Sequence, residues 1–201
     1  MKTFSTVLFD LGRVLINIDF DAFPRSLGLD PEHARPDERT AVGQLAIRYE
    51  TGRLTTDEFF EALGELLRGR YTRKQLVAAW NAIIRDENSA ILPIVDAVQA
   101  RCRTAVLSNT NPIHFQKSSD GTTILKKFSK RYLSFQIGAV KPDPEIYRYV
   151  VRDLSVEPST IVLIDDVAEN VKAAGQCGMV GILFENVSKL EKDLRLRRIL
   201  V

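Results

Sequence analysis

Several polar residues lie at or shortly beyond the ends of short apolar runs of the chain. The residues that share this position are Asp10, Ser108, Asn109, Lys141, Asp165 and Asp166. Acids, a hydroxyl and a lysine can together hold a divalent cation and a phosphoryl group. The cation offsets the repulsion between carboxylates and phosphate, and the lysine neutralises remaining charge. The set therefore points to chemistry on a phosphate ester, provided that the fold brings its members together.

The apolar runs themselves predict β-strands. The predicted strands are 6–9, 104–107, 132–137, 160–164 and 180–184. Two of them contain continuously apolar stretches, which suits strands covered on both faces, and helical spacing separates the last four. The sequence thus predicts an α/β protein with a Rossmann-like, doubly wound parallel sheet. Because ligands sit at the carboxyl ends of parallel strands, the polar residues should converge there.

The interval between the first two predicted strands has a different pattern. Almost no strand signal appears from residue 18 to about 93, but helical patterns cover 56–67 and 73–84. An insert of this size is too long for a strand-to-helix loop. We therefore expect a helical cap inserted after the first strand, with a core domain of residues 1–16 and 94–201 and a cap domain of residues 17–93.

Further helices are predicted at 167–177, from Pro144 onward, and at 189–199. The polar stretch 116–131 is expected to be loose, with a turn at 118–121. Two residues with ring side chains are expected to have structural roles. His114 could reach the rim of the site, but is expected to be a polar residue at a helix start. Trp80 is expected to belong to the core of the cap, although an aromatic ring that faces the cleft could stack on a sugar.

Composition limits the classes of partner. The chain has 201 residues, 45% of them hydrophobic, and a net charge of +2, which is too small an excess to build a basic surface for nucleic acid or an anionic membrane. Cys102 and Cys177 stand far apart, in no spacing typical of metal sites. We expect a cytoplasmic protein, monomeric or homodimeric, that neither spans a membrane nor is exported.

Taken in order, the polar motifs resemble the four motifs of the haloacid dehalogenase-like (HAD) hydrolase superfamily. They are Asp10, Ser108-Asn109, Lys141-Pro142 and Asp165-Asp166. The helical insert is similar to that of the helical-cap subclass, and the resemblance covers essentially the whole chain. It is closest to the subgroup with Asp-Leu-Gly at the first motif, which includes bacterial α-D-glucose-1-phosphate phosphatases. The stretch Tyr49-Glu50-Thr51-Gly52-Arg53-Leu54 also resembles that subgroup.

The resemblance implies a phosphatase that works through an aspartyl-phosphate intermediate. Asp10 would be the nucleophile. Mg²⁺ would be held by Asp10, the backbone carbonyl of Gly12 and Asp166, with Asp165 as a further ligand or as a partner behind the ligands. The substrate would be a small phosphorylated metabolite, with a sugar phosphate as the class suggested by the subgroup.

The remaining motif residues would bind the phosphate. Ser108 and the backbone N–H of Asn109 would bind phosphate oxygens, and Lys141 would lie between the nucleophile and the phosphate. Pro142 keeps Lys141 out of helical geometry, which aims its amine inward. Asp19, near the hinge to the insert, is predicted to contact the substrate.

One position departs from the pattern of the superfamily. Most of its phosphatases carry a second aspartate two residues after the nucleophile, as general acid and base, and here that position is Gly12. Losing such a group typically costs roughly 10²–10⁴-fold in rate. Asp19 or a cap residue could replace it, the leaving group could need less help, or the protein could mainly bind phosphate ligands.

Two other functions stay open at the level of sequence. A 2-haloacid dehalogenase also uses an aspartate nucleophile and lacks the second acid. Dehalogenases need no metal, however, so the pair Asp165-Asp166 argues against that function. A catalytically weakened protein that binds phosphate or a partner is supported only by Gly12.

Overall fold

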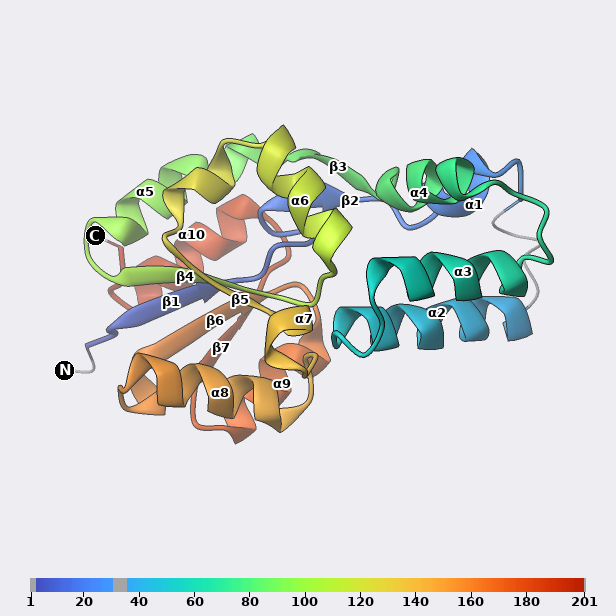
Figure 1. Cartoon of the computed structure of the whole chain (residues 1–201). Helices are drawn as coiled ribbons and strands as arrows, with labels where there is room; N and C mark the ends of the chain where they lie inside the picture. The colour runs from blue at the N-terminus through green and yellow to red at the C-terminus, as the bar shows by residue number, and fades with distance from the viewer. Residues whose placement is uncertain (1–2, 31–35, 201) are drawn as a thin grey trace.

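A five-stranded parallel sheet forms the centre of the computed structural model, which describes residues 3–30 and 36–200 (Figure 1). The strand order is β5-β4-β1-β6-β7. The strands are β1 (Thr6–Phe9), β4 (Arg103–Ser108), β5 (Lys130–Leu133), β6 (Ile161–Asp165) and β7 (Val180–Leu183). In the central register, Phe9 pairs with Val106 on one side and Ile164 on the other. Chain segments that follow β1, β4 and β6 therefore emerge side by side.

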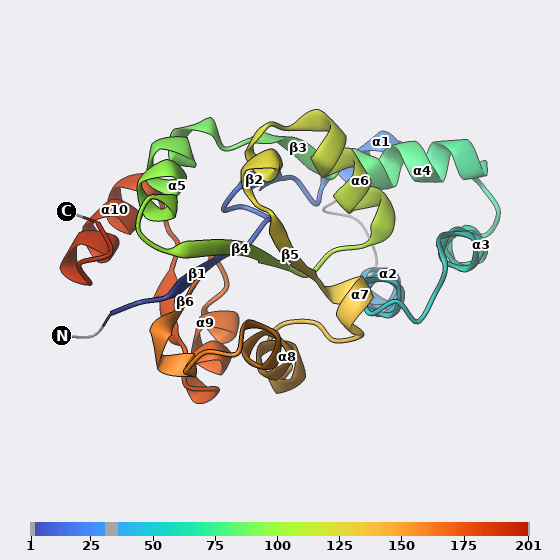
Figure 2. The ribbon, with the colours of Figure 1, turned by 60° about the vertical axis from the view of Figure 1, so that its left-hand side comes forward.

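Helices cover both faces of this sheet, which confirms the predicted doubly wound α/β fold. Helices α5 (Leu92–Gln99) and α10 (Val187–Leu196) lie over one face, and α8 (Pro144–Leu154) and α9 (Ala168–Gln176) over the other (Figures 1 and 2). Side chains alternate along β1, as a strand requires. Phe9 joins the cluster on the α10 side, and Leu8 joins the cluster on the α8 side.

Four helices of the insert lie beyond the carboxyl ends of the strands (Figure 1). They are α1 (Ala22–Ser26), α2 (Pro36–Glu50), α3 (Thr56–Leu66) and α4 (Arg73–Asn81). Helices α3 and α4 each begin with a capping box, in which Thr55 and Thr72 exchange hydrogen bonds with the residue three positions later. The rings of Phe59 and Trp80 pack against each other between these helices, 4.8 Å apart.

A two-stranded antiparallel ribbon joins the insert to the sheet. It consists of β2 (Ile16–Ile18) and β3 (Ile84–Glu87). The backbone N–H of Asn88 donates to the carbonyl of Leu15 over 2.9 Å, and that of Asp19 donates to the carbonyl of Ile83 over 3.0 Å. Both passages of the chain between sheet and insert are thus bonded to each other. The sequence did not predict this ribbon, because β3 reads Ile-Arg-Asp-Glu and has no apolar alternation.

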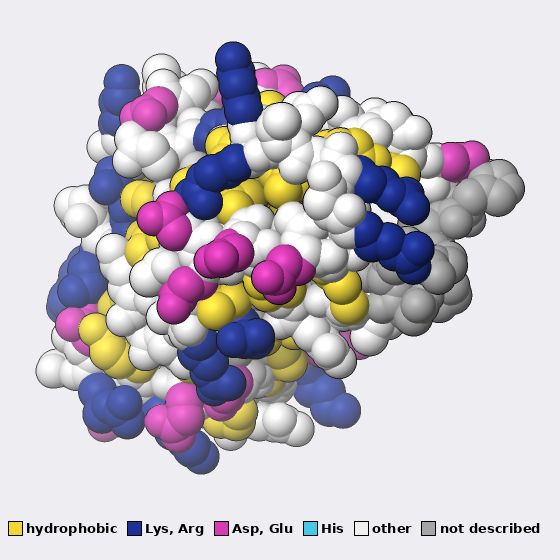
Figure 3. Space-filling model, turned by 45° about the vertical axis from the view of Figure 1, so that its right-hand side comes forward, with side chains coloured by type: hydrophobic (Ala, Val, Ile, Leu, Met, Phe, Trp, Pro, Cys, Tyr) yellow, Lys and Arg dark blue, Asp and Glu magenta, His cyan; other side chains and the backbone are white. Residues whose placement is uncertain are grey.

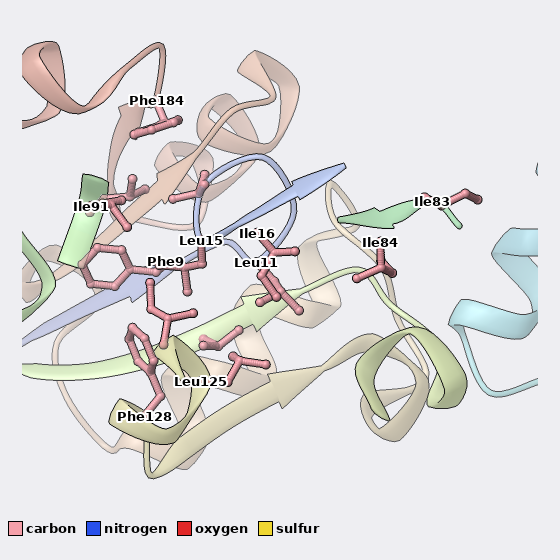
Figure 4. Packing of buried hydrophobic residues seen from close by; sticks show 14 of the residues in the cluster. Phe9, Leu11, Leu15, Ile16, Ile83, Ile84, Ile91, Leu125, Phe128 and Phe184 are labelled. Atoms are coloured by element: carbon pink, nitrogen blue, oxygen red, sulfur yellow. The ribbon is translucent and has the colours of Figure 1, made fainter. Parts of the chain in front are cut away.

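Packing makes up for that weak strand pattern. Ile16 and Ile84 are buried and pack in one cluster with Leu11, which continues to Phe9 of the sheet and Phe128 (Figure 4). The predicted helix 73–84 accordingly ends early, at Asn81. Tertiary contacts therefore override the local preference in this segment.

Two further local predictions were wrong. The predicted strand 132–137 ends at Leu133, and its second half is a helical turn, α7 (Ser134–Ile137), which ends at Gly138 with φ of +86°. The predicted turn at 118–121 is the last part of α6 (Pro112–Gly121). Short 3₁₀ turns occupy Ser89–Ile91, Ile124–Lys127 and Pro158–Thr160.

The end of α2 touches the core at one glycine, which supplies a test of this junction. Gly52 has φ of +67°, and a Cβ there would lie 2.4 Å from the carbonyl oxygen of Phe135 in α7. Gly69 has nearly the same φ, +65°, but open space around it. We predict that Gly52→Ala lowers the free energy of unfolding by about 1–3 kcal/mol more than Gly69→Ala does. Urea unfolding of both variants measures this, and equal losses would contradict the close contact.

Candidate active site

A cavity of about 450 Å³ opens where β1, β4 and β6 end. Its walls include six of the residues singled out from the sequence: Asp10, Gly12, Ser108, Asn109, Lys141 and Asp166. Asp10 directly follows β1, and Ser108 is the last residue of β4. Parallel pairing of neighbouring strands brings these residues together, as the sheet topology requires.

Lys141 is the centre of this site. Its ammonium group donates to Asp10 Oδ1 over 2.7 Å, to Asp165 Oδ2 over 2.6 Å and to the carbonyl oxygen of Leu107 over 3.0 Å. An ammonium group has three N–H donors, and all three have partners here. The side chain is 1% exposed, so these bonds form away from solvent. The ammonium group therefore has a fixed position between two carboxylates.

The loops that carry these residues are bonded to each other. The side-chain oxygen of Asn109 accepts from the backbone N–H of Lys141 over 2.7 Å, and its amide donates to the Lys141 carbonyl over 2.8 Å. Buried Ser134 of α7 accepts from the Thr110 N–H and donates to the Thr110 carbonyl, each over 3.0 Å. Asn109 thus positions Lys141 through its side chain and faces the cavity as well.

Asp165 lies beneath the cavity wall and is fully buried. Its Oδ1 accepts from the Val167 N–H and from Asn170 Nδ2, both over 2.9 Å, while its Oδ2 accepts from Lys141. Both oxygens are therefore engaged. This pattern favours Asp165 as the residue that orients Lys141 and supports the neighbouring acid, Asp166.

The surroundings of Asp10, Asp166 and Lys141 shift the pKa values of these groups. Burial raises the pKa of Asp10 above its usual range, although Lys141 counteracts it, and burial together with Asp165 raises the pKa of Asp166. Burial opposes the charge of Lys141, but Asp10 and Asp165 outweigh that effect and raise its pKa. Arg13 lies 3.6 Å from Asp166 and is mostly exposed. The site thus favours additional positive charge.

The acid cluster fits a divalent cation. Asp10, Asp165 and Asp166 each offer a carboxylate oxygen, and these oxygens all lie within 4.8 Å of one another. Three carboxylates and one ammonium group carry a formal charge of −3 + 1 = −2. Oxygen ligands and an excess of negative charge are what hard divalent cations require.

Asp19 does not join this group. It is not among the residues that line the cavity, and its carboxylate accepts a hydrogen bond from Arg25 over 2.5 Å. The substrate contact predicted for Asp19 thus gains no support from the geometry.

His114 lies in the first turn of α6 and also reaches the cavity. It lines the cavity, is buried, and stacks on Trp80 with ring centroids 5.2 Å apart. Its Nε2 lies 2.8 Å from the Trp80 carbonyl oxygen, and its Nδ1 lies 3.2 Å from Asn111 Nδ2. Burial lowers the pKa of His114 to about 4. The imidazole is therefore neutral near pH 7 and joins α6 to α4.

A second cavity, of about 420 Å³, adjoins the first within the cap. Most of its walls are apolar, including Phe23, Leu67 and Trp80. Glu50, the last residue of α2, lines both cavities. Sequence reasoning gave Glu50 no role; the only signal was its place in the stretch 49–54 that resembles the family subgroup.

Comparison with known proteins bears directly on this site. The family model described as haloacid dehalogenase-like hydrolase matches residues 4–178. The chain belongs to this family. Among HAD-like hydrolases, it is 29% identical over 197 residues to D-ribitol-5-phosphate phosphatase from Bacteroides thetaiotaomicron, covering 94% of this chain and 95% of the relative.

Solved structures of HAD-like hydrolases have the same fold. A HAD family enzyme from Bacteroides thetaiotaomicron, in complex with magnesium and inorganic phosphate, superimposes with a TM-score of 0.80 at 27% identity, covering 93% of this chain and 98% of that one. A predicted HAD-like hydrolase from Porphyromonas gingivalis shares the fold with a TM-score of 0.78 at 24% identity, covering 96% and 98%. The predicted membership of the superfamily is thus confirmed.

The surface of this HAD-like hydrolase carries charges of both signs. Figure 3 shows basic and acidic side chains interspersed with apolar ones on the face that it presents. Within residues 3–30 and 36–200, every helix is too short or too polar to cross a membrane.

The buried imidazole predicts a loss of stability in acid. Unfolded His114 takes up a proton near its usual pKa of 6.5, whereas the folded state resists protonation until about pH 4. Stability is complete above pH 6.5 and falls as the pH drops toward 4, by about 2 kcal/mol at pH 5. Urea unfolding of the wild type and His114→Gln at pH 7 and pH 5 isolates this contribution. If both proteins lose the same free energy between these pH values, His114 is not responsible.

Proposed function

We propose that this chain is a Mg²⁺-dependent phosphomonoesterase that acts through an aspartyl-phosphate on Asp10. The observation that carries this proposal is the buried contact of Lys141 with Asp10 and Asp165, in a cavity that also presents Ser108 and Asp166. A carboxylate held beside an ammonium group, with a hydroxyl and a second acid in reach, suits phosphoryl transfer better than it suits dehalogenation. The magnesium and phosphate bound by the enzyme from Bacteroides thetaiotaomicron support it.

Electrostatics explain why such a site needs a cation. A phosphate dianion would approach a cluster of three carboxylates and one ammonium group with a formal charge of −2, and like charges repel strongly where water is scarce. Asp10, Asp166 and the backbone carbonyl of Gly12 would hold Mg²⁺, with Asp165 supporting them from behind. Bound there, Mg²⁺ supplies charge neutralisation between the carboxylates and the phosphate oxygens.

The side chains of this chain then have distinct roles. Asp10 attacks phosphorus and forms the acyl phosphate, which water later hydrolyses. Ser108 and the Asn109 backbone N–H bind phosphate oxygens, and Lys141 stabilises charge that develops on them. Because Lys141 is already bonded to Asp10, its positive charge lies next to a phosphate attached to that residue.

The substrate is proposed to be a small phosphorylated metabolite. Similarity to D-ribitol-5-phosphate phosphatase over 94% of the chain favours phosphorylated sugars or sugar alcohols. The two adjoining cavities, of about 450 and 420 Å³, have room for a leaving group of that size beyond the phosphate. A 2-haloacid substrate is less favoured, because a metal-free reaction leaves the acid cluster without a purpose.

Removal of the metal and substitution of the nucleophile test the proposed phosphatase activity directly. We predict phosphate release from p-nitrophenyl phosphate, ribitol 5-phosphate or glucose 1-phosphate in the presence of Mg²⁺ and its loss in EDTA. Asp10→Asn should lower kcat by more than about 10³-fold, because the nucleophile is removed while the shape is kept. Release of inorganic phosphate measures both effects. Chloride release from a 2-haloacid without metal would favour the dehalogenase, and saturable phosphate binding without turnover would favour a silent protein.

Asp19→Asn is the matched control among aspartates. Because Asp19 lies outside the cavity and is bonded to Arg25, its substitution should change kcat/KM by less than about threefold, as for ordinary surface changes. A loss of tenfold or more in kcat/KM would instead support the substrate contact predicted from the sequence.

A further inference from the structure

The position that carries the general acid in most phosphatases of this superfamily is Gly12 here, which has no side chain that could donate a proton. A Cβ on Gly12 would lie 3.3 Å from Ile18 Cγ1 of β2, so a longer side chain would crowd that strand. A proton donor for the leaving group must then come from another element. We propose that Glu50 of the cap is this general acid and base. The proposal rests on the phosphatase function proposed above and names one more catalytic residue for it.

Glu50 lies where the two cavities meet. The residues that line both cavities are Phe20, Gly43, Ala46, Glu50, Ile83 and His114. A monoester whose phosphate lies at Ser108 and Lys141, and whose leaving group extends into the cap cavity, passes this shared wall. The oxygen that links phosphorus to the leaving group is then on the side of Glu50.

Few side chains on the wall that the two cavities share can donate a proton. Of the residues on the shared wall, Glu50 and His114 have ionisable side chains. Both ring nitrogens of His114 already face hydrogen-bond partners, and the ring is neutral near pH 7. The Glu50 carboxyl has no hydrogen bond or ion pair among those found in the described residues. A general acid needs such a free group within reach of the substrate.

The end of α2 that carries Glu50 is held in place. Glu50 belongs to the cap, but the chain next to it is fixed to the core, since Gly52 packs directly against the Phe135 carbonyl of α7. The Thr51 hydroxyl donates to the Ile47 carbonyl over 2.8 Å, and the Tyr49 hydroxyl bonds to Thr56 over 2.8 Å. These contacts hold the end of α2, and Glu50 with it, at the wall of the cavity.

Electrostatics agree with this position. Burial raises the pKa of Glu50 to about 7, and nearby Lys141 offsets only part of that effect. A carboxyl group with this pKa is protonated in about half of the molecules at neutral pH, so it can give up a proton and take one up again. The other charged or titratable groups on the two cavities are Asp10, Arg13, Asp21, Arg39, His114, Lys141 and Asp166.

The two half-reactions then balance. An oxygen of Asp10 bonds to phosphorus, the bond from phosphorus to the ester oxygen breaks, and that oxygen keeps the electron pair and takes the proton of Glu50. The alcohol leaves, and Glu50 is a carboxylate. Water then attacks phosphorus and gives a proton to Glu50, while the bond from phosphorus to Asp10 breaks. Inorganic phosphate leaves, and both residues return to their starting states.

Leaving-group dependence tests this role. Benzyl phosphate and p-nitrophenyl phosphate have similar shapes, but the benzyl alkoxide is a far stronger base than p-nitrophenolate and needs protonation. For Glu50→Gln, kcat/KM should fall by roughly 10²–10⁴-fold on benzyl phosphate, and far less on p-nitrophenyl phosphate. This constant reports steps up to phosphorylation of Asp10, so a slow second half-reaction does not obscure it. Glu50→Asp should restore part of the benzyl phosphate activity.

The control is Glu61→Gln, an exposed glutamate of α3, which should leave both constants unchanged. Thermal unfolding of Glu50→Gln checks that the fold is kept. Equal losses on the two substrates, or none, would overturn the role of Glu50 and leave the phosphatase proposal intact. Wild-type protein without Asp10-dependent phosphate release would overturn the phosphatase proposal and the role of Glu50 together.

Discussion

One buried ammonium group between two carboxylates organises the functional end of this molecule. Lys141 bonds to Asp10 and to Asp165, which come from different strands, while its own backbone is bonded to Asn109 after a third strand. Breaking such a buried charge pair by removing one partner typically costs about 3–5 kcal/mol, because the remaining charge is left without compensation. Loss of either partner is therefore costly, and the same contact orients the nucleophile.

This arrangement also sets the electrostatic character of the cavity. The three N–H donors of the lysine are all engaged, so none is left to form a hydrogen bond with Asp166. Arg13 near Asp166 is largely exposed, and water weakens its influence. The protein thus folds with an excess of buried negative charge, which a bound divalent cation relieves. Stability and cation affinity are linked through the same carboxylates.

The sequence was sufficient to predict that the polar residues at the ends of strands come together. Asp10, Ser108 and Asp165 follow or end continuously apolar segments, and parallel pairing alone brings such positions together. Two kinds of feature were beyond it. The ribbon of Ile84–Glu87 depends on packing of its isoleucine rather than on a local pattern, and the position of Glu50 depends on how α2 meets α7. Distant contacts of this kind leave no periodic signal along the chain.

The paired passages between sheet and insert have a consequence for how such proteins vary. Because Ile18 lies opposite Ile84 in antiparallel register, the roughly 65 residues between them leave and rejoin the sheet at a single point. In chain connectivity, the whole insert takes the place of the turn of a long hairpin. Evolution can lengthen, shorten or replace the insert without changing the path of any strand. New leaving groups can therefore be accommodated while the phosphate chemistry at the ends of the strands stays the same.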